Sequence, residues 1–404
     1  MLKRIIKHPF VKKTSVLFSG SLVTSAIGLL GFFIVAKLYT TDTLGSFYMF
    51  ISIITILSTI ANFGYTQAIP LLDDSETKDM YSSIFLLATI IIFLFAPVIL
   101  YLNQYGIFIL FITLLNTYIS IVDQSFVRDQ RVHDLNIIRV GKIVLTLSFV
   151  ILSFYIFGDN LDMLIYVHFV SSMIFVIYLK LKYFQDIKII NFNSNTKVIL
   201  KKYIRFPKFI GPGMIFHQIA YQIPILIAGS YFSPSVAANY NMAFKLVYTP
   251  ASLVSSAISQ VYMGDLSKKN RNGENIFHSL KKISLGLFLF AIFFVIAISL
   301  VLPYIVNTFF DAQWSSSIDM SMALLPLIFA LISIAPLTSL FQFTNNQKYI
   351  FTVHLFSMLI AFSSFAIAVY AKDFLLGVQI FAIVMFIRYI FLALKLKGLN
   401  NENH

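Results

Sequence analysis

Apolar segments long enough to cross a lipid bilayer recur along almost the whole chain. A membrane-spanning helix needs about 20 mostly apolar residues, and twelve runs of that kind can be marked between short polar connections. We predict spans at 15–39, 44–66, 80–102, 107–127, 138–157, 161–181, 209–232, 235–263, 284–307, 319–343, 349–371 and 374–394. The pattern predicts an all-α polytopic membrane protein of about 12 transmembrane helices.

A stripe of polar residues follows one face of the eighth predicted helix. Its members are three or four positions apart, which is the period of one helix face. They are Asn241, Lys245, Tyr248, Ser252, Ser255 and Ser259. A matching stripe occurs 193 positions earlier, in Tyr48, Ser52, Thr55, Thr59, Asn62 and Thr66. An offset near half the chain length indicates an internal duplication, a common construction in transporters.

This repeat divides the chain into three parts. Residues 1–181 form an N-terminal six-helix bundle, 182–206 a basic linker, and 207–404 a C-terminal six-helix bundle. The linker carries several of the basic residues and no predicted span. We therefore expect two repeated bundles joined by a connection at the membrane surface.

The composition supports a membrane protein and fixes a topology. The chain is 58% hydrophobic and 12% charged, whereas soluble domains have about 25% charged residues. The net charge of +13 does not indicate nucleic acid, because nearly all Lys and Arg residues lie in connections between spans. All but three of the 30, namely Lys37, Lys245 and Lys372, fall on one side. The positive-inside rule then places both termini in the cytoplasm.

The connections on the other side are too short to hold a soluble catalytic domain. The longest runs from Asn307 to Ile318. The sequence also lacks a phosphate-binding loop and a nucleophile elbow, and with no cysteine it has no disulfide or thiolate metal site. We predict that the chain is not an enzyme, which disfavours a membrane-embedded polymerase or glycosyltransferase, and we expect no cofactor.

Lys245 is the candidate site residue of greatest interest. A helix that runs inward from Ser235 at about 1.5 Å per residue places it about 15 Å deep, near the bilayer midplane. A lysine there cannot face lipid cheaply, so it should face protein or a wet cavity. There it would suit a phosphate, diphosphate or carboxylate. The alternative is a structural role on a helix C-terminus or a group of carbonyls.

The seventh predicted span, 209–232, and the residues just before it contain prolines and a polar cluster. Pro207, Pro212 and Pro224, with Pro250 in helix 8, are candidate hinges, although prolines are common in membrane helices. Gln218 and Gln222 are candidate binding residues. His217 is a candidate for proton coupling or for simple packing.

Other ionisable residues have simpler alternatives. Asp123 is the only acid well inside a span, so it is either a coupling-ion site or a partner of nearby Arg128. Arg139, Lys142 and Arg388 are interpreted as residues that snorkel to lipid headgroups. The acidic run from Asp73 to Asp79 resembles a loose metal site, but helix capping is favoured. The histidines of the spans have no metal-ligand spacing.

Several motifs together carry a resemblance to a known family. A basic amino terminus leads into a Gly/Ser-rich helix that ends in Ala36-Lys-Leu-Tyr39, followed by Gly45-x-Phe47. The second half repeats this as Phe206-Pro with Pro212, then Ala238-Asn-Tyr240 with Lys245 and Pro250. Over essentially its whole length the chain resembles the polysaccharide-transporter branch of the multidrug/oligosaccharidyl-lipid/polysaccharide (MOP) exporter superfamily, the Wzx-type O-antigen flippases.

The resemblance implies a MATE-like, V-shaped pair of six-helix bundles around a central cavity. It implies that the protein moves an undecaprenyl-diphosphate-linked oligosaccharide to the outer leaflet by alternating access, for O-antigen, capsule or exopolysaccharide synthesis. It implies a multi-pass protein of the bacterial inner membrane, in contact with membrane lipids. A monomer is expected, and contacts with polysaccharide polymerase or export proteins stay open, as does coupling to H+ or Na+.

Two other branches of the superfamily fit less well. Lipid II flippases carry an Arg-Asp pair in helix 1, where this chain has Gly31-Phe32. A MATE-like drug or organic-cation antiporter, the alternative function, usually has a membrane-embedded acid in its first half, and here only Asp123 would serve.

Overall fold

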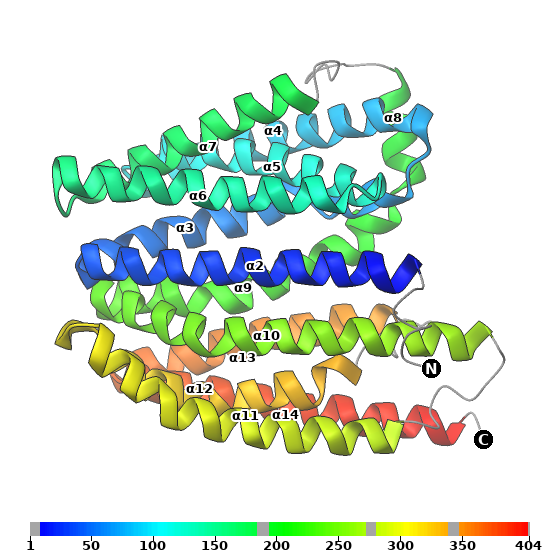
Figure 1. The fold of residues 1–404 in the computed structure, drawn as a ribbon. Helices are drawn as coiled ribbons and strands as arrows, with labels where there is room; N and C mark the ends of the chain where they lie inside the picture. Colours follow the sequence, from blue (N-terminus) through cyan, green and yellow to red (C-terminus); the bar gives the residue numbers. More distant parts are fainter. Residues whose placement is uncertain (1–8, 184–193, 272–279, 338–346, 403–404) are drawn as a thin grey trace. The chain divides into compact units, whose positions relative to one another are not determined.

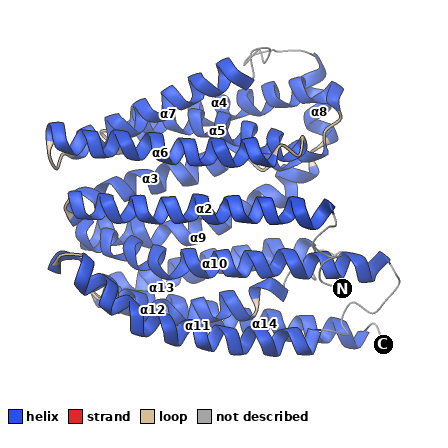
Figure 2. Ribbon diagram, in the orientation of Figure 1, coloured by secondary structure: helices blue, strands red, loops and turns tan. Residues whose placement is uncertain are grey.

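The computed structural model describes residues 9–183, 194–271, 280–337 and 347–402, and within these ranges the chain is helical with no β-strand (Figure 1, Figure 2). The chain divides into two compact units, residues 1–226 and 227–404. Each unit is built from long apolar helices, which satisfy their own backbone hydrogen bonds as a bilayer requires. The prediction of an all-α polytopic fold is confirmed.

The first unit contains six long helices, with α5 at their centre. They are α2 (Pro9–Leu38), α3 (Thr41–Asn62), α4 (Thr77–Leu102), α5 (Gly106–Arg128), α6 (Val132–Phe157) and α7 (Leu161–Tyr183). Helix α5 packs against α3, α4, α6 and α7. The short elements are η1 (Tyr65–Leu71), η2 (Asp74–Glu76), α8 (Ser194–Lys202) and η3 (Phe206–Ile210), and α9 (Gly211–Ile227) follows them.

The second unit repeats this plan around α12 (Ser316–Ser333), which packs against α10, α11 and α14. Its other elements are η4 (Ala228–Phe232), α10 (Pro234–Arg271), α11 (Leu280–Phe309), η5 (Ala312–Trp314), α13 (Gln347–Ala371) and α14 (Phe374–Glu402). Trp314 is fully buried beside α12. The most buried span of each unit is therefore the central helix against which the others pack.

The helix pairings support the duplication. The contacts of α5 with α3, α4 and α7 correspond to those of α12 with α10, α11 and α14, and α6–α7 corresponds to α13–α14. The first residues of α3 and α10, Thr41 and Pro234, are 193 positions apart, as are the two polar stripes. The same helix-packing plan has thus been used twice.

The structure corrects several predicted boundaries. Ten helices in the described ranges are long and apolar enough to cross a membrane. Helix α10 is not among them because of its polar stripe, and within α2 the stretch whose side chains are described, Leu22–Leu38, is apolar. The fifth span begins at Val132 rather than at 138. The tenth, predicted to reach 343, runs into residues outside the described ranges.

The second span ends earlier than predicted for a conformational reason. Helix α3 stops at Asn62, because Phe63 and Gly64 adopt left-handed backbone conformations with φ of 43° and 77°. A Cβ atom on Gly64 would lie 2.7 Å from the Cα of Gly211. Only glycine fits this turn, and its close approach joins the end of α3 to the start of α9.

The boundary between the compact units differs from the predicted division of the repeats. It lies between Leu226 and Ile227, so α8 and almost all of α9 belong to the first unit. The predicted linker, 182–206, contains the helix α8, which the sequence pattern did not indicate. The division into 1–181, 182–206 and 207–404 stays a prediction about the repeats.

Candidate functional site

The N-terminal part of the α10 stripe combines a lysine with an amide and an aromatic ring. Asn241 is 7% exposed and its Nδ2 has no hydrogen-bond partner in the described part of the chain. Lys245 and Tyr248 are partly buried, and the Tyr248 ring stacks on Phe244 with 4.4 Å between ring centroids. A cation, a buried amide donor and a fixed phenol therefore lie along two turns of one helix.

The C-terminal part of the same stripe makes hydrogen bonds that pack the bundle. The Ser255 hydroxyl donates to the Leu331 carbonyl of α12 at 2.8 Å. Ser252 and Ser259 donate to carbonyls of α10 itself, those of Thr249 at 2.9 Å and Ser255 at 2.8 Å. Hydroxyls that bond backbone within a bundle are common packing devices in membranes. Ligand binding thus remains a prediction chiefly for Asn241, Lys245 and Tyr248, with Ser252 one turn further along the helix.

The hydroxyl groups of the matching stripe on α3 form hydrogen bonds to carbonyl groups of α3 itself. Ser52, 1% exposed, donates to the Tyr48 carbonyl at 2.8 Å, and Thr55 donates to the Ile51 carbonyl at 2.7 Å. Tyr48 is 8% exposed and its ring lies against Phe32. Asn62 keeps a buried Oδ1 with no partner in the described residues. For Ser52 and Tyr48 the burial favours a packing role, the alternative that sequence analysis left open.

The candidate residues of helix 7 lie in α9, within the first unit. Gln218 and Gln222 are partly buried, and the His217 ring is 4.7 Å from that of Tyr221. Two π-helical turns flank α9: η3 contains Pro207, and η4 begins four residues after Pro224. Such turns mark places where a helix departs from regular hydrogen bonding. The hinge role of Pro207, Pro212, Pro224 and Pro250 stays a prediction.

Asp123 pairs with a residue that sequence analysis did not consider. Its Oδ2 accepts a hydrogen bond from Arg139 Nε of α6 at 3.1 Å, while Oδ1 is buried with no hydrogen bond to any described residue. The predicted partner Arg128 instead binds Asp74 and Asp129. Lys142 lies 3.5 Å from Asn116 Oδ1 of α5. Arg139 and Lys142 therefore contact α5, a role that sequence reasoning did not assign, and their snorkelling to headgroups stays a prediction.

Arg388 likewise turns toward a neighbouring helix. Its Nη1 donates to Ser357 Oγ of α13 at 2.7 Å, and its guanidinium lies 4.4 Å from the Tyr389 ring centroid. The Arg388 guanidinium is therefore hydrogen-bonded to α13, as is common between membrane helices, and its snorkelling stays a prediction.

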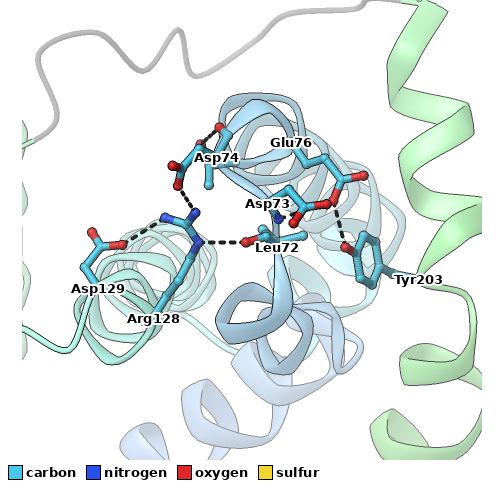
Figure 3. A network of polar contacts seen from close by, with 8 residues as sticks. Leu72, Asp73, Asp74, Glu76, Arg128, Asp129 and Tyr203 are labelled. Atoms are coloured by element: carbon cyan, nitrogen blue, oxygen red, sulfur yellow. Dashed lines mark hydrogen bonds and ion pairs between the residues drawn. The ribbon is translucent and has the colours of Figure 1, made fainter.

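A network of hydrogen bonds and ion pairs connects the segment before α4 to the end of α5 and to α8 (Figure 3). Arg128 donates from Nε to the Leu72 carbonyl at 3.0 Å and from Nη1 to Asp129 at 2.8 Å, and it also pairs with Asp74. Glu76 accepts from the Tyr203 hydroxyl at 2.8 Å and pairs with Lys202. The Lys202–Glu76 bond raises the pKa of Lys202.

This network explains the acidic run before α4. Asp73 and Glu76 form a capping box, so the predicted capping role is confirmed. In the described residues no group of three His, Cys, Asp or Glu residues could hold a metal ion. The bonds from Glu76 to Lys202 and Tyr203 cross more than a hundred positions. No local sequence signal indicates such pairs.

Several solved structures of membrane transporters and flippases share this fold. An inward-facing MATE multidrug transporter of the MOP superfamily aligns with a TM-score of 0.67 at 12% identity, covering 94% of this chain and 95% of that one. The inward closed lipid II flippase MurJ gives 0.69 at 14% identity, covering 95% and 87%. A MOP transporter from Pyrococcus furiosus, described as having a binding pocket of reverse polarity, gives 0.60 at 13% identity, covering 96% and 95%. The protein thus has the MOP superfamily fold.

The family follows from the sequence model. Residues 10–263 match the model of the family described as polysaccharide biosynthesis protein. This match covers more than half of the chain, so the protein belongs to that family. No curated protein gives a significant sequence match. The chain is therefore a multi-pass membrane protein of the polysaccharide biosynthesis family. Its fold is the one found in known transporters and flippases.

Proposed function

We propose that the protein is a flippase that moves a polyprenyl-diphosphate-linked oligosaccharide from the cytoplasmic to the outer leaflet of the bacterial inner membrane. The observation that carries this proposal is Lys245, which lies within α10 between Asn241 and Tyr248. A lysine so far from the helix ends is expensive in lipid unless it serves a ligand or a partner.

Each part of the proposed substrate has a chemically suitable partner in the protein or the lipid. A diphosphate needs a cation, and an ammonium is a common point-charge partner for phosphate. A sugar chain needs amide and hydroxyl groups, which Asn241 and Ser252 carry on α10. The polyprenyl tail needs only lipid. Family membership in polysaccharide biosynthesis supports this class of substrate.

Organic-cation export is the competing function, and Asp123 is the residue on which it would depend. Arg139 already neutralises that carboxylate. A cation that binds there would have to displace a guanidinium, so we favour an anionic substrate. The coupling role proposed for Asp123 is weakened for the same reason.

The test is translocation of a fluorescent polyprenyl-diphosphoryl oligosaccharide in proteoliposomes. We expect the wild-type protein to move this lipid. The rate for Lys245→Ala should be lower by about tenfold or more, because a hydrogen bond to a charged group contributes about 1.5–3 kcal/mol. Lys245→Arg should retain most of the wild-type rate. Thermal melting of each purified variant separates lost function from lost folding. A wild-type protein that is inactive on such lipids but moves an organic cation would refute the proposal.

A further inference from the structure

Helix α8 is held on the first unit by one of its faces. Ile199 is buried in a cluster with Tyr65, Ile69 and Leu72. The Tyr65 hydroxyl donates to the Leu200 carbonyl at 3.2 Å, and Lys202 and Tyr203 bind Glu76. Apolar contact and hydrogen bonds therefore fix the orientation of this helix, and with it the direction in which the opposite face points.

The opposite face is exposed and basic. Lys197 and Lys201 are exposed and lie one helix turn apart on α8. Arg205 and Lys208, which follow the turn after α8 at the start of η3 and within it, are exposed as well. Within the described ranges none of these four makes an ion pair, whereas Lys202, on the docked side, does. No Asp or Glu occurs between Asp186 and Asp265. The chain itself thus supplies no acid in this segment to neutralise the four charges.

Apolar side chains are interspersed with these basic residues. Val198 is 69% exposed, Ile204 49%, Phe209 42% and Ile210 41%. The segment joins two candidate spans, which end at Tyr183 and begin at Phe206, so it lies at the level of a bilayer surface. A helix with exposed Lys and Arg and exposed large apolar groups is typical of segments that lie in the headgroup region.

We propose that this exposed face, defined by Lys197, Val198, Lys201, Ile204, Arg205 and Lys208, binds the headgroups of anionic phospholipids and anchors the first unit to the membrane interface. The basic side chains would contact phosphates, and Val198 and Ile204 would enter the upper acyl region. Because the docked face is fixed on Glu76 and Tyr65, lipid binding would hold the end of the first unit at a set depth. This inference does not depend on the transported substrate.

Site-directed spin labelling can test the depth of α8 directly. The chain has no cysteine, so a single Val198→Cys substitution gives one label without background. Its accessibility to oxygen and to a water-soluble nickel complex is measured in nanodiscs of neutral lipid and of lipid with about one-third anionic phospholipid. Leu71→Cys is the matched control, since Leu71 is 66% exposed on the neighbouring η1 beside acidic residues.

We expect anionic lipid to shift the Val198 label from water to the headgroup level and to leave the Leu71 label unchanged. The shift should be lost when Lys197, Lys201, Arg205 and Lys208 are all changed to Gln, and it should weaken at high salt. A Val198 label that stays in water in both lipids would overturn the proposal, as would one equally immersed in neutral lipid or in the Gln variant. So would a label immersed only when neutral discs contain a polyprenyl diphosphate, because that result would assign the face to substrate.

Discussion

Helices α3 and α10 begin 193 positions apart and carry matching polar residues, but those residues have different surroundings. In α3, Ser52 is 1% exposed and is satisfied by its own backbone. In α10 the equivalent position is Lys245, which is partly buried beside Asn241 and Tyr248. The comparison indicates that duplication supplied the same stripe twice, and that one copy serves packing while the other carries the charge.

The two helices also end differently. Helix α3 stops at Asn62, where Phe63 and Gly64 turn the chain toward Gly211, whereas α10 continues to Arg271. Ser255, the equivalent of Asn62, lies inside α10 and donates to α12. The first copy therefore ends in a tight turn, and the second extends as one continuous helix.

The largest effect is expected when a lysine is placed in α3 at the position equivalent to Lys245. Ser52→Lys would insert an ammonium where the side chain is almost fully buried, and we expect a loss of about 3 kcal/mol or a failure to fold. Thermal melting and the yield of monodisperse protein measure this. Ser52→Ala is the control and should change stability little. A stable, active Ser52→Lys protein would contradict the packing role of the α3 stripe.

The next largest effect concerns the turn that ends α3. Gly64→Ala should lower the free energy of unfolding by about 1–3 kcal/mol, because the new Cβ would meet backbone and the residue has a positive φ. The midpoint of thermal unfolding reports the change. Gly141→Ala is the control, since a Cβ atom added at Gly141 would meet no atom of a neighbouring element within 4 Å. Equal midpoints for the two variants would show that the Gly64–Gly211 approach is not needed.

The charged pair of the first unit should have a moderate effect. Arg139→Ala would leave Asp123 without its partner and should cost about 1–2 kcal/mol, less than a fully buried pair because the Arg139 side chain is 38% exposed. Adding Asp123→Asn should restore part of the loss in a melting experiment. If the double variant is as unstable as the single one, Arg139 acts through packing alone.

The smallest predicted effect separates the hydroxyls that cross between helices from those that do not. Ser255→Ala removes a hydrogen bond to α12 and should cost about 0.5–1.5 kcal/mol. Ser259→Ala removes only a bond to its own helix and should be close to neutral. Melting curves of the two variants decide the point. A larger loss for Ser259→Ala would reverse our assignment.

Much of the fold could be predicted because hydrophobic periodicity and charge placement act locally. The spans and the repeat follow from patterns of this kind. The end of α3 was missed because it depends on backbone conformations at Phe63 and Gly64 and on contact with Gly211. Helix α8 was missed because a nine-residue segment with polar or basic residues at both ends resembles a loop until its docking site is known.

The candidate site could be predicted only in part. The stripe and its lysine are visible in the spacing of residues along α10. The partners of Asp123, Glu76 and Arg388 were not, because they lie on other helices and depend on how those helices are rotated. Arg139, Lys142 and Arg388 were predicted to reach lipid headgroups because the sequence places them near the ends of spans. It does not show which polar groups a neighbouring helix offers.

Recognition of the diphosphate by Lys245 can be tested with a series of lipid headgroups. Initial flipping rates are measured for lipid-linked oligosaccharides that carry a diphosphate, a single phosphate or a neutral linker, in wild type and in Lys245→Met. We predict that wild type prefers the diphosphate over the neutral lipid by about tenfold or more and that Lys245→Met loses this preference. If Lys245→Met keeps the wild-type preference, Lys245 does not recognise the diphosphate and the account is contradicted.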